Sequence, residues 1–358
     1  MRVMKARARA IGSKRSRTVG VLLLAVLASA ALAACGSSSK SGKTANGLIQ
    51  LSIARTDPNG MQTSVFNVAQ QEGFFTKEGL KVSVPVLNGD AAAIPAVQSG
   101  AVDFTENTAP TVAAADHNGS HLSVIATFSY PPGEIILSKA AAAKAHITAS
   151  SPMADKVRAL KGQTLAVEDV GGGLQYQIDD LLQKYGVPTN SVNVVGISSF
   201  TSQLTSLQRG VIDGASIIPP FGNTAILQQG AVPVGNIWGG DVPQLSKTPY
   251  EVIDGSTSYI KAHPAIAEKV QKAFALALAW MHKQSAQVAK INEQALGGSF
   301  SAAAVEAGVG TGAGWPTSPK LIKADYDNVI AFMKVSGLAA DTDVSYGTLV
   351  APIARGRQ

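Results

Sequence analysis

Short apolar runs alternate with longer amphipathic segments between residues 48 and 229, and this alternation is the feature that most constrains the fold. The runs expected to form strands are residues 48–54, 81–87, 122–128, 164–168, 192–195 and 215–218. The segments expected to form helices are residues 63–71, 91–99, 109–118, 174–185, 200–208 and 224–229. Strands that alternate with helices form mostly parallel sheets flanked by helices. The sequence therefore predicts an α/β protein.

The alternation restarts after a break at Pro131-Pro132-Gly133, which suggests two related lobes. Residues 98–103 (QSGAVD) have a counterpart in residues 208–213 (QRGVID), and each segment follows a predicted helix. The glycine permits the left-handed conformation that ends a helix, and the aspartate suits the turn before a strand. We interpret the pair as a repeat and expect both aspartates to be structural. After residue 250 the chain is mainly helical, at residues 264–282, 285–296 and 320–335.

The first 35 residues have the pattern of a bacterial lipoprotein signal. Seven basic residues and no acidic residue precede an apolar run at residues 21–34, which is shorter than the about 20 residues of a membrane-spanning helix. The run ends in Leu32-Ala33-Ala34-Cys35, which resembles a lipobox, where the cysteine is acylated after cleavage. We expect a signal at residues 1–35, lipidation at Cys35 and a flexible tether at residues 36–46. An ordinary cleaved signal with an incidental cysteine is the alternative.

Charge and cysteine content exclude several classes of partner. The chain has 30 Lys and Arg against 24 Asp and Glu, but seven of the basic residues lie in the expected signal, so the mature chain is nearly neutral. The pI near 9.3 therefore indicates no nucleic-acid partner. Cys35 is the only cysteine, and no His-Glu-x-x-His motif is present, so neither a metal site nor a cofactor is expected.

Residues 68–80 (VAQQEGFFTKEGL) resemble the helix and turn of the nitrate/sulfonate/taurine and thiamine-pyrimidine-precursor group of binding proteins. Residues 98–103 and 160–167 are similar to the lobe-start motifs of that group. The resemblance covers most of residues 48–291. It implies a two-lobed type II periplasmic-binding-protein fold, and, with the lipobox, a monomeric lipoprotein on the outer face of the cytoplasmic membrane. Such a protein captures a small organic molecule between its lobes and delivers it to the permease of an ABC importer.

The resemblance also implies how the chain divides. The first lobe would comprise residues 47–136 and 250–358, and the second lobe residues 139–246. The chain would cross between them near residues 135–139 and 247–252. Some relatives of this fold are enzymes, a cysteine-dependent desulfinase and a pyrimidine synthase with a cysteine cluster, but an acylated Cys35 leaves no thiol for either reaction. No Gly-x-Ser-x-Gly nucleophile elbow is present either, so we expect no enzyme. A lipoprotein that senses a ligand and signals to a receptor is the remaining alternative.

Ligands of open α/β sheets bind beyond the carboxyl ends of the strands. The loops that this rule selects give the candidate ligand-binding residues Arg55, Asp57, Asn59, Asp90, Glu106, Asn107, Thr108, Gly172, Gly173, Gln175, Pro219 and Phe221. Turn chemistry alone is the alternative explanation for each of them. The three glycines at 171–173 permit close approach of the backbone to a ligand, but no Lys-Ser or Lys-Thr follows them, so they do not form a phosphate loop.

The same loops are poor in positive charge. No lysine or arginine lies between Lys81 and Lys139, and Arg55 is the only cation in the selected loops, beside Asp57, Asp90 and Glu106. Unpaired carboxylates oppose an anion, since like charges ~4 Å apart repel by about 4 kcal/mol at an effective dielectric constant of 20. We therefore expect a neutral or nitrogen-rich ligand, such as a pyrimidine-like precursor, over a small inorganic anion. The alternative is that the acids face solvent and Arg55 pairs with a sulfonate or carboxylate.

Overall fold

A computed structural model describes residue 44 and residues 46–87, 89–243, 245–310, 312–336 and 344–357. The expected signal peptide, its Cys35 and most of the expected tether lie outside these residues. Within the described part of the chain, no helix combines the length and the apolar character needed to cross a membrane.

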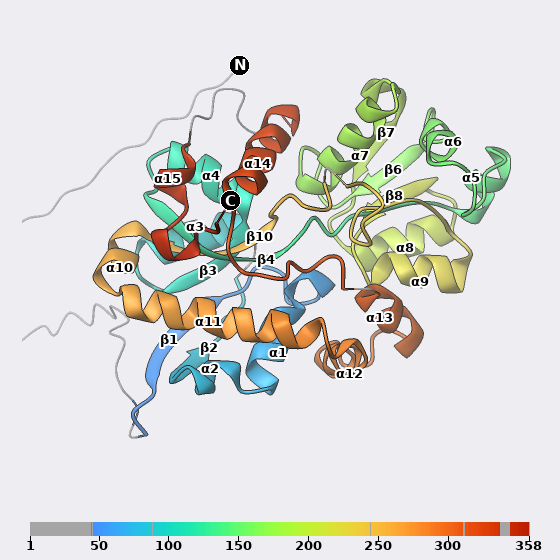
Figure 1. The fold of residues 1–358 in the computed structure, drawn as a ribbon. Coiled ribbons are helices and arrows are strands. Elements are labelled where there is room, and N and C mark those ends of the chain that lie inside the picture. The colour runs from blue at the N-terminus through green and yellow to red at the C-terminus, as the bar shows by residue number, and fades with distance from the viewer. Residues whose placement is uncertain are drawn as a thin grey trace, which may run out of the picture. The chain divides into compact units, whose positions relative to one another are not determined.

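The first lobe is built on a five-stranded sheet with the order β2-β1-β3-β10-β4 (Figure 1). Its strands are β1 (Ile49–Ala54), β2 (Leu80–Ser83), β3 (Phe104–Thr108), β4 (Leu122–Ser129) and β10 (Glu251–Ser256). Strand β1 pairs in parallel with β2 and β3, whereas β10 runs antiparallel to β3 and β4. The sheet is therefore mixed, and β10 reaches it from a distant part of the chain.

The second lobe repeats this arrangement in the order β7-β6-β8-β5-β9. Its strands are β5 (Glu134–Leu137), β6 (Thr164–Val167), β7 (Asn193–Gly196), β8 (Gly214–Ile217) and β9 (Val232–Asn236). Strand β6 pairs in parallel with β7 and β8, whereas β5 is antiparallel to β8 and β9. Each lobe thus places one antiparallel strand at the fourth position, which confirms a two-lobed α/β fold of the periplasmic-binding-protein type.

Helices flank both sheets (Figure 1). The first lobe carries α1 (Ser64–Gln71), α2 (Phe74–Lys77), α3 (Asp90–Gln98), α4 (Ala109–His117), α10 (Thr257–Ala262), α11 (Pro264–Met281) and α12 (Ser285–Ala295). The second carries α5 (Lys139–Lys144), α6 (Met153–Arg158), α7 (Gly173–Lys184), α8 (Phe200–Gln208) and α9 (Phe221–Gln229). The C-terminal segment adds α13 (Ala302–Val309), α14 (Lys323–Ser336) and α15 (Tyr346–Leu349). Three single turns of 3₁₀ helix are η1 (Met61–Thr63), η2 (Thr189–Ser191) and η3 (Pro352–Ala354).

The core of the first lobe is centred on three phenylalanines. The ring of Phe66 in α1 lies 5.6 Å from that of Phe128 in β4 and 5.1 Å from that of Phe274 in α11, both edge to face. Helix α11 buries one polar side chain on the same face, where Gln271 Nε2 donates to the carbonyl oxygen of Ile125 at 2.6 Å. Burial of each phenylalanine contributes about 1.5–3 kcal/mol, so these rings hold α1 and α11 on the sheet.

The repeated segments occupy equivalent places in the two lobes. Asp103 Oδ2, just before β3, accepts the backbone N–H of Ser52 in β1 at 2.7 Å. Asp213 Oδ2, just before β8, accepts the backbone N–H of Thr164 in β6 at 2.8 Å. Each aspartate ties the start of one strand to its parallel neighbour, which confirms the expected structural role.

The C-terminal helix α14 contacts both lobes. It packs against α4 of the first lobe and α7 of the second. Met333 belongs to an apolar cluster with residues of α4, whereas Phe332 belongs to the core cluster of the second lobe. The ring of Phe332 meets that of Tyr176 in α7 edge to face, with centroids 6.1 Å apart. No signature in the sequence predicts this bridging position.

Two features differ from the sequence-based expectations. Strand β5 pairs with β8 and β9 of the second sheet, so the chain crosses between the sheets at residues 130–133, before the expected 135–139. The return crossing spans residues 237–250, and β10 follows where mainly helical structure is expected. Strands β3, β5, β9 and β10 were not predicted. Of these, β3 and β10 are buried yet rich in polar residues, such as Glu106, Asn107 and Asp254.

Candidate ligand-binding cleft

A cavity of about 690 Å³ is lined by residues of both lobes and by Phe332 of α14. The first lobe contributes the loop after β1, the first turn of α3, the end of β3 and the start of β10. The second contributes the loop after β6, the first turns of α7 and α8, and the end of β8. The carboxyl ends of the parallel strands therefore face this cavity, as the general rule for open α/β sheets requires.

Asp90 and Thr108 form the centre of the first-lobe wall. Asp90 Oδ2 accepts hydrogen bonds from the backbone N–H and from Oγ1 of Thr108, at 3.2 and 3.1 Å. Thr108 Oγ1 in turn accepts the N–H of Thr111 and so caps α4. Burial raises the pKa of Asp90, and the hydrogen bonds from Thr108 and Thr111 oppose that rise. This network fixes the carboxylate at the edge of the cavity.

Glu251 lies next to this network at the start of β10. It pairs with Thr108 in the antiparallel register between β10 and β3, and both residues line the cavity. Its residue is only 5% exposed, and among the described residues its carboxylate has no hydrogen-bond or ion-pair partner. Burial raises its pKa well above the usual range, and Glu106, Asp90 and Asp57 raise it further. Glu251 is thus a buried carboxylate open only to the cavity.

The second-lobe wall is formed by Glu168, Asp169 and the glycine loop that opens α7. Gln175 Oε1 accepts the N–H of Gly171 at 2.8 Å and so holds this loop on the helix. A Cβ atom at Gly173 would lie 2.1 Å from the hydroxyl oxygen of Tyr250, so only glycine permits the close approach of that ring. Partial desolvation in the cleft raises the pKa of Glu168 to about 7, with additional repulsion from Asp57 and Asp169.

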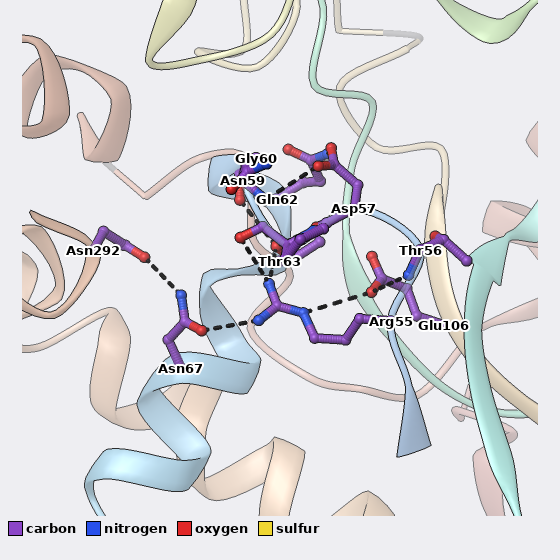
Figure 2. A network of polar contacts seen from close by, with 11 residues as sticks. Arg55, Thr56, Asp57, Asn59, Gly60, Gln62, Thr63, Asn67, Glu106 and Asn292 are labelled. Atoms are coloured by element: carbon purple, nitrogen blue, oxygen red, sulfur yellow. Dashed lines mark hydrogen bonds and ion pairs between the residues drawn. The ribbon is translucent and has the colours of Figure 1, made fainter. Parts of the chain in front are cut away.

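Arg55 is not among the residues that line the cavity, and polar contacts hold it within the first lobe (Figure 2). Its guanidinium donates to Asn67 Oδ1 at 3.0 Å, to Thr63 Oγ1 and to the carbonyl oxygen of Pro58 at 3.4 Å. Its Nε lies 3.9 Å from Glu106 Oε2, and the group stacks over the ring of Phe66. These contacts leave the residue 6% exposed, so its charge is directed into the lobe.

Glu106 is fully buried beside Arg55. Its Oε2 also accepts the N–H of Thr56 at 3.4 Å, whereas Oε1 has no hydrogen-bond partner. Burial raises the pKa of Glu106 to about 8, although the charge of Arg55 opposes the rise. The guanidinium of Arg55 is therefore directed toward Glu106 and the interior of the lobe, and not into the cavity.

The structure brings part of the predicted set together. The candidates that line the cavity are Asp57, Asp90, Thr108, Gly172 and Gly173. Those outside its lining are Arg55, Asn59, Glu106, Asn107, Gln175, Pro219 and Phe221. Asn107 points to the other face of the sheet and donates to Asp254 at 2.7 Å. Phe221 packs edge to face on Phe300 at 4.7 Å, the N–H of Asn59 donates to Asp57, and the carbonyl oxygen of Pro219 accepts the N–H of Met61.

Sequence reasoning missed Glu168, Tyr250, Glu251 and Phe332, which all line the cavity. Glu168 directly follows β6, so the strand-end rule contained the signal for it. Tyr250 and Glu251 come from the return crossing and β10, and Phe332 from α14, whose positions no local pattern reveals.

The fold and the cleft define a protein of the periplasmic-binding-protein class. The NMT1/THI5-like family model matches residues 61–287, which is more than half of the chain, so the chain belongs to that family. No curated protein sequence matches the chain significantly.

Several solved structures share the fold at low sequence identity. The alkanesulfonate-binding protein SsuA from Xanthomonas axonopodis, bound to MOPS, is 18% identical with a TM-score of 0.61, over 88% of this chain and 100% of that one. The aliphatic sulphonate-binding protein SsuA from Escherichia coli is 16% identical with a TM-score of 0.63, over 82% and 92%. The desulfurization enzyme DSZB is 14% identical with a TM-score of 0.60, over 85% and 97%.

Proposed function

We propose that this protein is an extracytoplasmic solute-binding lipoprotein that captures a small organic molecule and delivers it to an ABC importer. The observation that carries the proposal is the cavity of about 690 Å³ with walls from both lobes. Cavities of roughly 300–1,000 Å³ at domain interfaces are typical of small-molecule sites. The two sulfonate-binding SsuA proteins that share this fold support a binding role.

The lining of the cavity supports a neutral or nitrogen-rich ligand over a small inorganic anion. Its charged side chains are all acidic, and Arg55 is held by Glu106, Asn67 and Thr63. We therefore do not propose a sulfonate, the ligand class of the two SsuA proteins, as the ligand of this chain. The lipid anchor is proposed from the Leu32–Cys35 lipobox.

An enzyme is the rival class, because DSZB shares the fold. Neither a cysteine nor a histidine is among the residues that line the cavity, so the lining offers no thiol or imidazole for nucleophilic or acid–base catalysis. We therefore propose binding, rather than catalysis by a cysteine or a histidine, for the cleft.

A thermal-shift screen of the purified protein against small metabolites of all charge classes tests the binding role. A ligand at a hundredfold over its Kd adds about 2.7 kcal/mol to the stability of the folded state. We expect at least one compound to raise Tm by several degrees, and a blank screen would contradict the proposal. Uptake of that compound in cells that lack the gene separates import from sensing, since a sensor leaves uptake unchanged.

A further inference from the structure

The cavity has an unusual balance of charge. Its lining includes the five carboxylates Asp57, Asp90, Glu168, Asp169 and Glu251, and no lysine, arginine or histidine. These acids come from both lobes, so carboxyl groups line the cleft on both walls. Glu106 lies directly behind the first-lobe wall, on the same face of the sheet as Thr108 and Glu251.

Among the residues that the structure describes, the lining contains no basic side chain that offsets these acids. Arg55 is the cation next to the cluster, and its two terminal nitrogens donate to Asn67, Thr63 and Pro58 inside the lobe. Its Nε faces Glu106 at 3.9 Å. The guanidinium is therefore engaged inside the lobe and provides no counter-ion for the carboxylates of the lining.

Glu251 indicates that this group of five acids binds a ligand in the cavity. An ionised carboxylate that is buried without a partner is costly, and proteins retain such groups mainly where a ligand or a proton compensates them. Glu251 is buried, lacks a partner among the described residues and lines the cavity together with Asp90 and Glu168. A group of acids on an ordinary exposed surface would contain no buried carboxylate that lacks a partner.

We propose that the cleft selects an organic cation, with a protonated amine or amidine nitrogen held between Asp90 and Glu251 of the first lobe and Glu168 and Asp169 of the second. The inference rests on the proposed binding function and names its ligand class. Four aromatic residues of the lining, Tyr176, Phe200, Tyr250 and Phe332, supply apolar contacts for the body of the ligand. Aromatic faces also attract cations, by about 0.5–2 kcal/mol each.

An organic cation fits the cleft better than a metal ion does. Among the described residues, no three His, Cys, Asp or Glu side chains are close enough together to hold a metal. The cavity of about 690 Å³ is also far larger than one ion with its ligands. Carboxylates that are spread over two walls suit a charged group on a larger molecule.

Three ligands with one ring and different charges test the inference: benzamidinium (positive), benzamide (neutral) and benzoate (negative). Calorimetric titration of the wild-type protein should show binding of benzamidinium at least tenfold tighter than binding of the other two. Glu251→Gln and Asp169→Asn should each weaken benzamidinium binding about tenfold or more. Glu72→Gln, at an exposed acid at the end of α1, should change nothing. Melting curves confirm that each variant is folded, and Asp169 is exposed, so its replacement does not disturb the core.

Equal or tighter binding of benzoate or benzamide would overturn the inference and leave the binding function intact. Failure of all three ligands at millimolar concentration would also overturn it, while the metabolite screen judges the binding function separately. A response to magnesium, calcium or zinc chloride in the absence of any response to benzamidinium would assign the acids to a metal instead.

Discussion

Arg55 Nε lies 3.9 Å from Glu106 Oε2, and both side chains are buried beneath the wall of the cleft. The pair also joins η1 and α1 to the sheet, because Arg55 donates to Thr63 and Asn67. This arrangement makes Arg55 a residue of the fold, and it explains why a cation that the sequence places beside the site does not line the cleft.

Replacement of Arg55 should therefore affect stability. We expect Arg55→Met to lower the free energy of unfolding by about 1–3 kcal/mol at neutral pH, because Thr63 and Asn67 lose their buried donor. The loss should increase above about pH 8, where Glu106 would ionise without its counter-ion, and adding Glu106→Gln should remove that increase. Urea unfolding of the wild type and of the two variants at about pH 7 and about pH 9 measures both effects. Unchanged stability of Arg55→Met together with lost ligand binding would instead make Arg55 a ligand contact.

Glu134 in β5 predicts a pH dependence of stability. It is 2% exposed and accepts a hydrogen bond from Asn223 Nδ2 at 3.1 Å, and burial raises its pKa to about 8. The folded state thus keeps a proton that the unfolded state releases near pH 4.5. The contribution of Glu134 to stability is therefore fully present below pH 4.5 and is lost as the pH rises through about 8. Glu134→Gln should flatten this slope, and Glu306→Gln, at an exposed acid, should not. Urea unfolding at about pH 5, 6.5 and 8 measures how the stability of each variant depends on pH. Equal slopes for the two variants would refute the prediction.

Gly173 and Tyr250 should behave as a coupled pair. Gly173→Ala places a methyl group 2.1 Å from the Tyr250 hydroxyl oxygen, so we expect the ring to shift and stability to fall by about 1–3 kcal/mol. Removal of that oxygen in Tyr250→Phe leaves ring carbons at 3.2 and 3.5 Å as the nearest atoms. The double variant should therefore lose much less than Gly173→Ala alone. Additive losses in a double-mutant cycle would show that the two residues do not interact.

Cation binding should be linked to proton release. The pKa of Glu168 is raised to about 7 in the free cleft, and a bound cation would lower it. The affinity for benzamidinium should therefore increase several-fold from about pH 6 to about pH 8. Titration in two buffers of different ionisation enthalpy should show proton release in the wild type and less in Glu168→Gln. Proton uptake on binding would be the wrong sign for this mechanism.

The lipobox predicts acylation at Cys35. Cys35→Ser lacks the thiol that forms the thioether, so it should carry no lipid and should no longer fractionate with membranes. Metabolic labelling with a fatty acid, followed by fractionation, compares the two proteins directly. Equal labelling of wild type and variant would remove the anchor from the proposal.

The fold was predictable where strands are apolar and helices amphipathic. Strand β1 and helix α1 follow from local pattern, because one face of each is buried against the sheet core. Strand β10 does not, since its buried Asp254 is stabilised by Asn107, which lies over 100 positions away in the sequence. The topology of the fold determines which residues surround β10. A short segment of sequence does not contain that information.

The site was predictable to the extent that backbone geometry determines it. Asp57 and Asp90 follow strand ends, and the strand-end rule places them at the cavity without knowledge of their side-chain contacts. Arg55 follows the same rule and is nevertheless directed inward, because its long side chain reaches the acceptors on η1 and α1. The direction of a long side chain depends on partners that only the folded chain brings near.

Helix α14 bears on how long a bound molecule remains in place. It packs on α4 and α7 at once, and its Phe332 both lines the cavity and meets the ring of Tyr176. The two walls cannot separate while both of these helix contacts persist. The residence time of a ligand therefore depends on the weaker of the two contacts of α14, with α4 or with α7, as well as on the contacts that the ligand makes. Substitutions on the α4 side of that helix would alter the dissociation rate of the ligand from outside its binding site.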